Sequence, residues 1–278
     1  AGKCIAYRLG IDVVIVPTLA SNGAPTSAVS VIYTSGGVSS GAEFFPQNPA
    51  IVIVDTQVVA NASTRYLVAG IGDAMATWYE ARVCLNNPNA TTIMGTRPTL
   101  AANAISTICA ETLYAVGEAA VESVKANRVD EALEKVVEAN TLLSGLGFES
   151  GGLAVAHAIA QSYTNLPIVH ANYLHGEMVA MGVLTQLMIE GDVDEANKAA
   201  EFFAKVGLPI HLGQLSVEVS DTASLNLLAK ETSEYATVAN MPMEITKAVA
   251  LRGVIAAHDL GSKVAGKIGD SAYQSLHN

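Results

Sequence analysis

The sequence predicts a short α/β segment over residues 1–62 followed by an all-helical domain over residues 63–278. Two apolar, β-branched runs, Ile11–Val16 and Ala50–Asp55, are typical of buried parallel strands. After Thr56, glycine and proline become sparse and long segments carry apolar residues at helical spacing. This change of pattern places the boundary between the two parts near Asn61–Ser63.

The remaining elements of residues 1–62 follow from local signals. Ala1–Leu9 has the composition of the end of a helix, and the polar segment Thr18–Ser27 follows the carboxyl end of the first strand. Open α/β sheets bind ligands at that end, so Thr18–Ser27 is the first candidate site loop. Segments Val29–Thr34 and Val38–Phe45 flank Ser35-Gly36-Gly37 and predict a hairpin.

The helical part contains one segment with clear start and stop signals. Asp130 is a suitable N-cap, the apolar positions continue to Leu143, and Gly145 and Gly147 predict the helix end. The same spacing predicts helices over Gly70–Leu85, Pro98–Asn127, Gly152–Tyr163, His175–Glu190, Val193–Val206, Thr222–Glu234 and Thr246–Gly261.

Composition and charge exclude several partners. The 278 residues carry a net charge of −11, which repels nucleic-acid backbones and anionic membrane surfaces. The most apolar stretches have the length of strands, so no membrane span is expected. Cys4, Cys84 and Cys109 are odd in number and lack metal-type spacing, which predicts buried reduced thiols and a cytoplasmic location.

Three polar residues lie in segments otherwise suited to burial: Asp73, His157 and His175. Taken singly, each has a structural interpretation, as a helix N-cap, a core histidine and a helix-start residue respectively. Together, one carboxylate and two imidazoles from three helices form a suitable ligand set for Zn²⁺ or Fe²⁺ with a coordination position left open. Spacing alone does not decide between these interpretations.

Several segments carry a resemblance to a known family: Ala20–Ala28, Gly70–Ala81, Glu138–Ala154 and His175–Gly182. They resemble glycerol dehydrogenases of the iron-containing (group III) alcohol dehydrogenase superfamily. The match runs in order over essentially the whole chain, and the stretch Glu138–His157 is long enough to be specific by itself.

The resemblance implies a partial Rossmann-like parallel-sheet domain over residues 1–62 followed by a helical metal-binding domain over residues 63–278, a dehydroquinate synthase-like architecture. It implies NAD-dependent oxidation of glycerol, or a similar small vicinal diol, to dihydroxyacetone, in a homo-oligomer. A divalent metal, Zn²⁺ or alternatively Fe²⁺, would bind the alkoxide, which passes a hydride to NAD. The metal-ligand and catalytic positions correspond to Asp73, His157 and His175. The positions that contact NAD correspond to Thr18, Leu19, Ala20, Ser21, Ser27, Val29 and Tyr33.

The sequence departs from the family pattern near the expected cleft. Gly23 occupies a position that usually holds an aspartate, Ala160 and Ala239 stand where relatives often have histidine, and Met178 replaces a common lysine. These changes leave glycerol less firmly implied than the reaction class. Another reaction on the same architecture, such as dehydroquinate synthesis, is disfavoured because the segments around the ligands contain few basic residues for carboxylate or phosphate binding.

Residues 1–62 also offer fewer strands than an open sheet usually has. We therefore expect that further strands and a Gly-rich pyrophosphate loop precede Ala1, and that the chain as given binds NAD poorly or is inactive. The alternative function is a non-catalytic or degenerate metal-binding paralogue that has lost cofactor binding.

Overall fold

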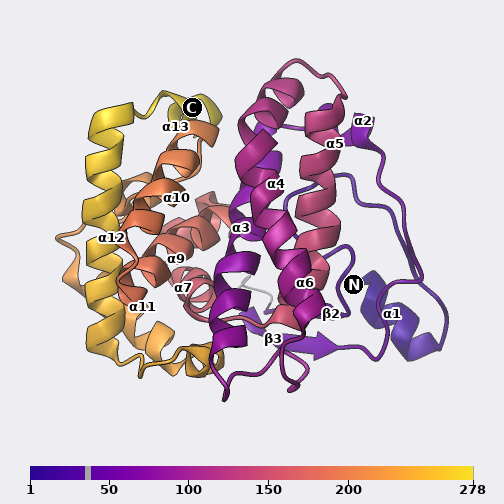
Figure 1. Ribbon diagram of the computed structural model, residues 1–278, viewed down its shortest axis with the longest axis horizontal. Helices are drawn as coiled ribbons and strands as arrows, with labels where there is room; N and C mark the ends of the chain where they lie inside the picture. The colour runs from indigo at the N-terminus through magenta and orange to yellow at the C-terminus, as the bar shows by residue number, and fades with distance from the viewer. Residues whose placement is uncertain (35–38, 278) are drawn as a thin grey trace.

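Helices make up most of the molecule, and the strands and the first helix lie along one side of the helical bundle (Figure 1). The computed structural model describes residues 1–34 and 39–277. The elements before residue 56 are α1 (Gly2–Leu9), β1 (Val14–Ile15), β2 (Val29–Tyr33), β3 (Ser39–Phe44) and β4 (Ile51–Val52). The division of the chain near residue 62 remains a prediction.

The strands form two separate pairs. β1 pairs in parallel with β4, with Val14 opposite Ile51, and β2 pairs antiparallel with β3, with Val29 opposite Phe44. The parallel pairing and the hairpin are therefore as predicted, while the predicted turn at 35–37 lies outside the described residues. The prediction that the parallel strands are buried is wrong here, because Val14 is 51% and Ile51 53% exposed. Each of these strands is only two residues long, and such a narrow pair leaves its side chains open to solvent.

The helical region begins at residue 56 and contains α2 (Thr56–Ala60), α3 (Thr64–Asn86), α4 (Leu100–Lys125), α5 (Glu131–Glu138), η1 (Ala139–Leu143), α6 (Ser144–Gly151), α7 (Val155–Tyr163), α8 (Pro167–Asn172), α9 (His175–Glu190), α10 (Val193–Val206), η2 (Leu212–Leu215), α11 (Thr222–Glu234), η3 (Ala236–Asn240), α12 (Lys247–Ile268) and α13 (Ser271–His277). Here η1 is a π-helical turn, and η2 and η3 are 3-10 turns. The bounds of α9, α10 and α11 coincide with the predicted ones. Asp192 and Asp221 cap α10 and α11, and Gly191 ends α9 in the left-handed conformation with φ 77°.

The predicted helix end at Gly145 and Gly147 is wrong, because the helical path continues through η1 and α6 to Gly151. A Cβ on Gly145 would lie 1.9 Å from Thr26 Oγ1, and a Cβ on Gly147 would lie 2.4 Å from Thr77 Cγ2. Both glycines thus permit close packing by α6 against neighbouring segments. Their role is set by contacts with residues far away in the sequence, which local stop signals do not reveal.

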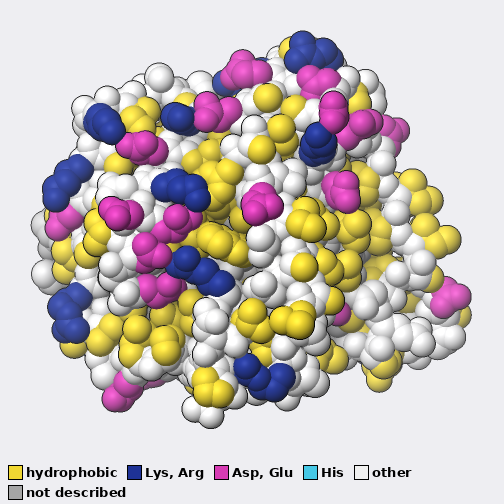
Figure 2. Space-filling model, viewed as in Figure 1, with side chains coloured by type: hydrophobic (Ala, Val, Ile, Leu, Met, Phe, Trp, Pro, Cys, Tyr) yellow, Lys and Arg dark blue, Asp and Glu magenta, His cyan; other side chains and the backbone are white. Residues whose placement is uncertain are grey.

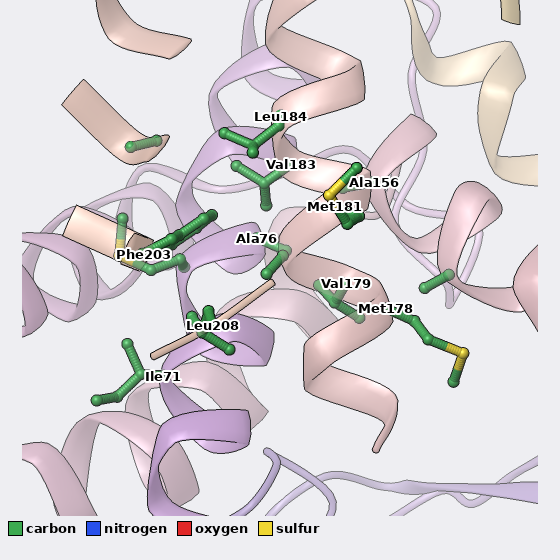
Figure 3. Close-up of a cluster of buried hydrophobic side chains, with 14 of the residues drawn as sticks. Ile71, Ala76, Ala156, Met178, Val179, Met181, Val183, Leu184, Phe203 and Leu208 are labelled. Atoms are coloured by element: carbon green, nitrogen blue, oxygen red, sulfur yellow. The ribbon is translucent and has the colours of Figure 1, made fainter. Parts of the chain in front are cut away.

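The core is centred on α3 and α9, which are buried on nearly all sides over the middle of their length. Figure 3 shows Ile71 and Ala76 of α3 facing the same apolar cluster as Val183 and Leu184 of α9, with Phe203 of α10 beside them. Both helices are therefore fixed by packing on several neighbours, and residues on their buried faces have well-defined positions.

The surface differs between the two parts of the chain. Charged side chains of both signs are spread over the helical region, whereas few appear around α1 and the strands (Figure 2). Large apolar side chains are exposed there instead, among them Ile5, Leu9 and Ile11.

Among the described helices, α4 is long and apolar enough to cross a membrane, and the bent pair formed by 131–151 and α7 would add a second span if counted as one segment. This criterion rests only on length and composition, and the core helix of a globular protein can meet it as well. Since α4 packs against α3, α5 and α6, it has the contacts of a core helix.

Candidate metal centre and its supporting residues

The structure brings together the three residues expected to bind a metal. Asp73 lies in α3, His157 in α7, and His175 begins α9. Asp73 Oδ1 is 3.5 Å from His157 Nε2 and 3.3 Å from His175 Nε2. All three ligand atoms lie within 4.8 Å of one another, and among residues 1–34 and 39–277 this is the one group of three or more such side chains that could hold a metal ion. Their role as metal ligands remains a prediction.

The three side chains differ in their exposure to solvent. Asp73 is buried, the His157 side chain is 13% exposed and the His175 side chain is 32% exposed. His175 is therefore the most exposed of the three side chains.

Glycines beside the ligands allow the three helices to approach closely. A Cβ on Gly72 would lie 2.3 Å from the carbonyl oxygen of Gly176, and a Cβ on Gly176 would lie 1.7 Å from that of Ala69. A Cβ on Gly182 would lie 2.1 Å from the carbonyl oxygen of Ala156. The first contacts join α3 to α9 and the last joins α9 to α7, so the ligands meet because their helices are in backbone contact.

Glu80 is a functional residue that the sequence analysis missed. Its side chain is fully buried in α3, and Oε1 accepts hydrogen bonds from the backbone N–H of Ala154 at 2.7 Å and of His157 at 3.0 Å. Oε2 accepts a hydrogen bond from His157 Nδ1 at 2.5 Å. The sequence signal that could have found it is the spacing. Glu80 is seven positions after Asp73, which is about two helical turns, so both carboxylates lie on the same face of the helix.

The electrostatics of the site are dominated by two buried carboxylates. Burial alone would raise the pKa of Asp73, but hydrogen bonds from His157 and His175 hold it below its usual range. Burial alone would lower the pKa of His157, but the Glu80 and Asp73 carboxylates raise it to about 10. Among the described residues, the ion pairs of Asp73 and Glu80 are with these histidines alone. The two buried negative charges that favour the protonated form of His157 would favour a divalent cation at the same place for the same reason.

The candidate loop Thr18–Ser27 is attached directly to this centre. The backbone N–H of Gly23 donates to Asp73 Oδ2 at 3.1 Å, so one carboxylate oxygen faces the histidines and the other faces the loop. Asn140, which lies in the π-helical turn η1, donates from Nδ2 to the carbonyl oxygens of Ala20 at 2.9 Å and Leu67 at 3.1 Å. The loop is thereby attached to α3 directly at Gly23 and, through Asn140, at Ala20.

Two more side chains anchor the loop from the other side. Lys3 Nζ donates to the carbonyl oxygens of Ala24 at 2.8 Å and Ser27 at 2.9 Å, and Glu149 accepts a hydrogen bond from the Ala28 N–H at 2.6 Å. Burial lowers the pKa of Lys3. With this many attachments, the loop has one defined conformation next to the metal centre.

The residues predicted to contact NAD lie along this loop and in the strand that follows it. Thr18 is exposed, Leu19 and Ser21 are half-buried, and Ala20, Ser27 and Val29 are buried, while Tyr33 ends β2. The Ser27 hydroxyl already donates to the Ala24 carbonyl oxygen. Exposure therefore favours the stretch from Thr18 to Ser21 as the one open to a ligand, and the contacts with NAD remain predictions.

No protein-family model matches the chain. It is 45% identical over 263 residues to a glycerol dehydrogenase from Escherichia coli, an alignment that covers 94% of this chain and 71% of that protein. It is 47% identical over 251 residues to a glycerol dehydrogenase from Thermotoga maritima, covering 88% and 67%. The solved structure of glycerol dehydrogenase from Schizosaccharomyces pombe matches with a TM-score of 0.90 at 35% identity, covering 96% and 68%. The chain belongs to the glycerol dehydrogenase family.

Membership of the glycerol dehydrogenase family confirms the expected fold class and makes the chain an oxidoreductase. Within this framework, Gly23 differs from the aspartate expected at its position. A Cβ on Gly23 would lie 2.8 Å from the backbone nitrogen of Gly145, so a side chain here requires the loop to move away from α6. Ala160 and Met178 are buried, whereas Ala239 is exposed.

Three residues close to the ligands in the sequence, Trp78, Tyr79 and Glu177, contribute to packing or to a helix start. Trp78 and Tyr79 follow Asp73 in an apolar helical segment and are expected to belong to the core; Tyr79 is fully buried there and Trp78 packs against it. Glu177 accepts hydrogen bonds from the Leu174 N–H at the start of α9 and from His277 Nε2, and it forms an ion pair with Arg65. This geometry favours the helix-start interpretation of Glu177.

Two other histidines differ from expectation. From the sequence, His170 is expected in an exposed loop before His175. The structure corrects this, because Pro167 starts the short helix α8 and His170 is half-buried within it. The sequence gives no indication of a role for His277, which donates from Nε2 to Glu177 at 2.9 Å and connects α13 to the start of α9.

Proposed function

We propose that this oxidoreductase oxidises glycerol, or a similar small vicinal diol, to dihydroxyacetone with NAD as the hydride acceptor. The observation that carries the proposal is the grouping of Asp73, His157 and His175 in a chain whose relatives are named glycerol dehydrogenases. The meeting of these three side chains from three helices, together with a loop bonded to Asp73, supports catalysis over a purely structural role.

The donor set fits one divalent metal ion. Two imidazole nitrogens and one carboxylate oxygen suit Zn²⁺, which we propose as the resident ion, with Fe²⁺ as the alternative. When bound, such an ion supplies Lewis acidity that makes an alcohol hydroxyl easier to ionise at neutral pH. Glu80 and the Gly23 N–H hold His157 and Asp73 in place for that task.

The protein contributes substrate and cofactor positioning through the loop. Thr18, Leu19, Ala20 and Ser21, with Ser27, Val29 and Tyr33 beyond them, are the proposed NAD contacts. Small loop residues let the backbone approach a nicotinamide ring closely, which places the acceptor carbon against the carbon that loses hydride. The bond from Gly23 to Asp73 keeps this surface at a fixed distance from the metal centre.

Selectivity for the diol does not depend on a side chain at position 23. Gly23 offers no hydrogen-bonding group beyond its backbone, and its N–H is already used by Asp73. We therefore propose a less strict preference among vicinal diols than a carboxylate at that position would give.

The proposal is tested by metal analysis and turnover in the same samples. Metal-free protein is titrated with Zn²⁺ and with Fe²⁺ under anaerobic conditions, alongside His157→Ala and His175→Ala. NADH formation is then followed with glycerol, 1,2-propanediol and ethanol. One bound ion per chain, lost in both variants, with NADH formed from the two vicinal diols but not from ethanol, supports the proposal.

Two results would contradict it. Failure of the unsubstituted protein to bind a stoichiometric divalent ion removes the metal centre. Metal binding without NADH formation from any vicinal diol favours the alternative of a metal-binding paralogue that has lost cofactor binding.

We further propose a cytoplasmic homo-oligomer. The three cysteines are free and buried, as expected in a reducing compartment. Sedimentation equilibrium gives the oligomeric state directly.

A further inference from the structure

Glu80 makes three hydrogen bonds to the segment that carries His157. One carboxylate oxygen accepts the backbone N–H groups of Ala154 and His157, and the other accepts the His157 ring at Nδ1. The side chain is fully buried, and these are all the partners that it has among the described residues. Both carboxylate oxygens of Glu80 are therefore bonded to α7 or its N-cap.

The chemistry of these groups fixes the state of the ring. An ionised carboxylate only accepts hydrogen bonds, so the hydrogen between Glu80 and His157 belongs to Nδ1. Nε2 faces Asp73 Oδ1 at 3.5 Å, and once the hydrogen on Nε2 has been lost, the neutral ring with hydrogen on Nδ1 has its lone pair at Nε2. Only a ring in this tautomer can offer a lone pair to an ion held beside Asp73.

We propose that Glu80 is the positioning residue of the metal centre, which selects the metal-binding tautomer of His157 and fixes the direction of its ring. The inference rests on the proposed metal site and adds a residue to it. The second buried negative charge of Glu80 also balances the charge of a divalent ion together with that of Asp73.

A purely structural role has a different consequence. Because Ala154 is the N-cap of α7, Glu80 also satisfies free N–H groups at the start of that helix. If that were its whole task, any side chain with an acceptor oxygen in the place of Oε1 would suffice.

Glu80→Gln separates the two roles. The glutamine oxygen can still accept the two backbone N–H groups, but its NH₂ group then faces Nδ1 and drives the ring hydrogen to Nε2, where it blocks the metal. We expect Zn²⁺ affinity to fall about 10- to 100-fold. The matched control is Glu195→Gln, a partly buried glutamate of α10 that accepts a hydrogen bond from Tyr79 and touches neither histidine.

Affinity is measured by competition with a chromophoric chelator, and the helical fold by circular dichroism. In the Zn²⁺-loaded unsubstituted protein, ¹⁵N NMR of the His157 ring should show a protonated Nδ1 and a metal-bound Nε2. A folded Glu80→Gln protein that binds Zn²⁺ as tightly as Glu195→Gln overturns the inference, as does an unprotonated Nδ1 in the unsubstituted protein. If the unsubstituted protein binds no Zn²⁺, the proposed function fails instead.

Discussion

The contact between Gly72 and Gly176 makes Gly72→Ala a direct test of how α3 and α9 bring Asp73 and His175 together. A Cβ at position 72 would lie 2.3 Å from the carbonyl oxygen of Gly176, whereas ordinary contacts begin at 3.4 Å. The helices must therefore separate by about 1 Å, since neither backbone can yield as a side chain would. Metal–ligand distances tolerate about 0.2 Å, so the two ligands would no longer fit one ion.

Two quantities follow from this separation. We expect Zn²⁺ affinity to fall at least about 10-fold, equivalent to about 1.4 kcal/mol. The free energy of unfolding of the metal-free protein should fall by about 0–2 kcal/mol, because an overpacking cost of about 1–3 kcal/mol is partly offset by the better helix propensity of alanine, about 1 kcal/mol. Chelator competition and urea unfolding measure the two quantities.

The control is Gly266→Ala in α12, where an added Cβ meets no heavy atom within 4 Å. It should leave Zn²⁺ affinity unchanged and raise stability by up to about 1 kcal/mol. Equal Zn²⁺ affinities for the two variants would refute the argument that backbone contact between α3 and α9 sets the ligand geometry.

Three further changes test the supports around the site. Asn140→Ala removes the hydrogen bonds from Asn140 to the carbonyl oxygens of Ala20 and Leu67, so the backbone amides of the loop near Ala20 should exchange hydrogen faster than in the unsubstituted protein. Unchanged exchange rates would show that Asn140 does not hold the loop in place. Arg65→Met removes the guanidinium that pairs with the buried carboxylate of Glu177, so the free energy of unfolding in urea should fall by about 3–5 kcal/mol. A fall below about 1 kcal/mol would show that the ion pair contributes little to stability. Hydrogen bonds from Ser123 and the Leu133 N–H lower the pKa of Asp130 to about 2. The stabilising effect of Asp130, measured against Asp130→Asn, should therefore be complete above about pH 4 and lost as the pH falls through about 2. Titration of the Asp130 carboxyl near pH 4, followed by NMR, would contradict this.

The helices of the carboxyl-terminal part were predictable because capping residues next to their ends mark where each one begins and ends. Asp192 and Asp221 cap helices that begin at the next residue, and Gly191 and Gly207 end helices in the left-handed conformation. The same local signal was misleading at Gly145, where the absence of a side chain serves contact with Thr26, 119 positions earlier in the sequence. Sequence periodicity contains no information about such contacts.

The candidate site was predictable in part for a similar reason. Asp73, His157 and His175 stood out as polar residues in apolar segments, and the structure places their ligand atoms together. Glu80 did not stand out, because a glutamate in a helix is ordinary until its burial is known. His277 bonds Glu177 from the far end of the chain, so its contact is visible only once α13 has packed against α10 and α3.

The central claim is that Asp73, His157 and His175 together hold one divalent ion. Calorimetric titration of the metal-free protein with Zn²⁺ tests it most directly, with Asp73→Ala, His157→Ala and His175→Ala measured in parallel. The account predicts one tight site per chain in the unsubstituted protein and its loss in each variant. A protein that binds no Zn²⁺, or a site that persists after removal of any of the three side chains, would contradict it.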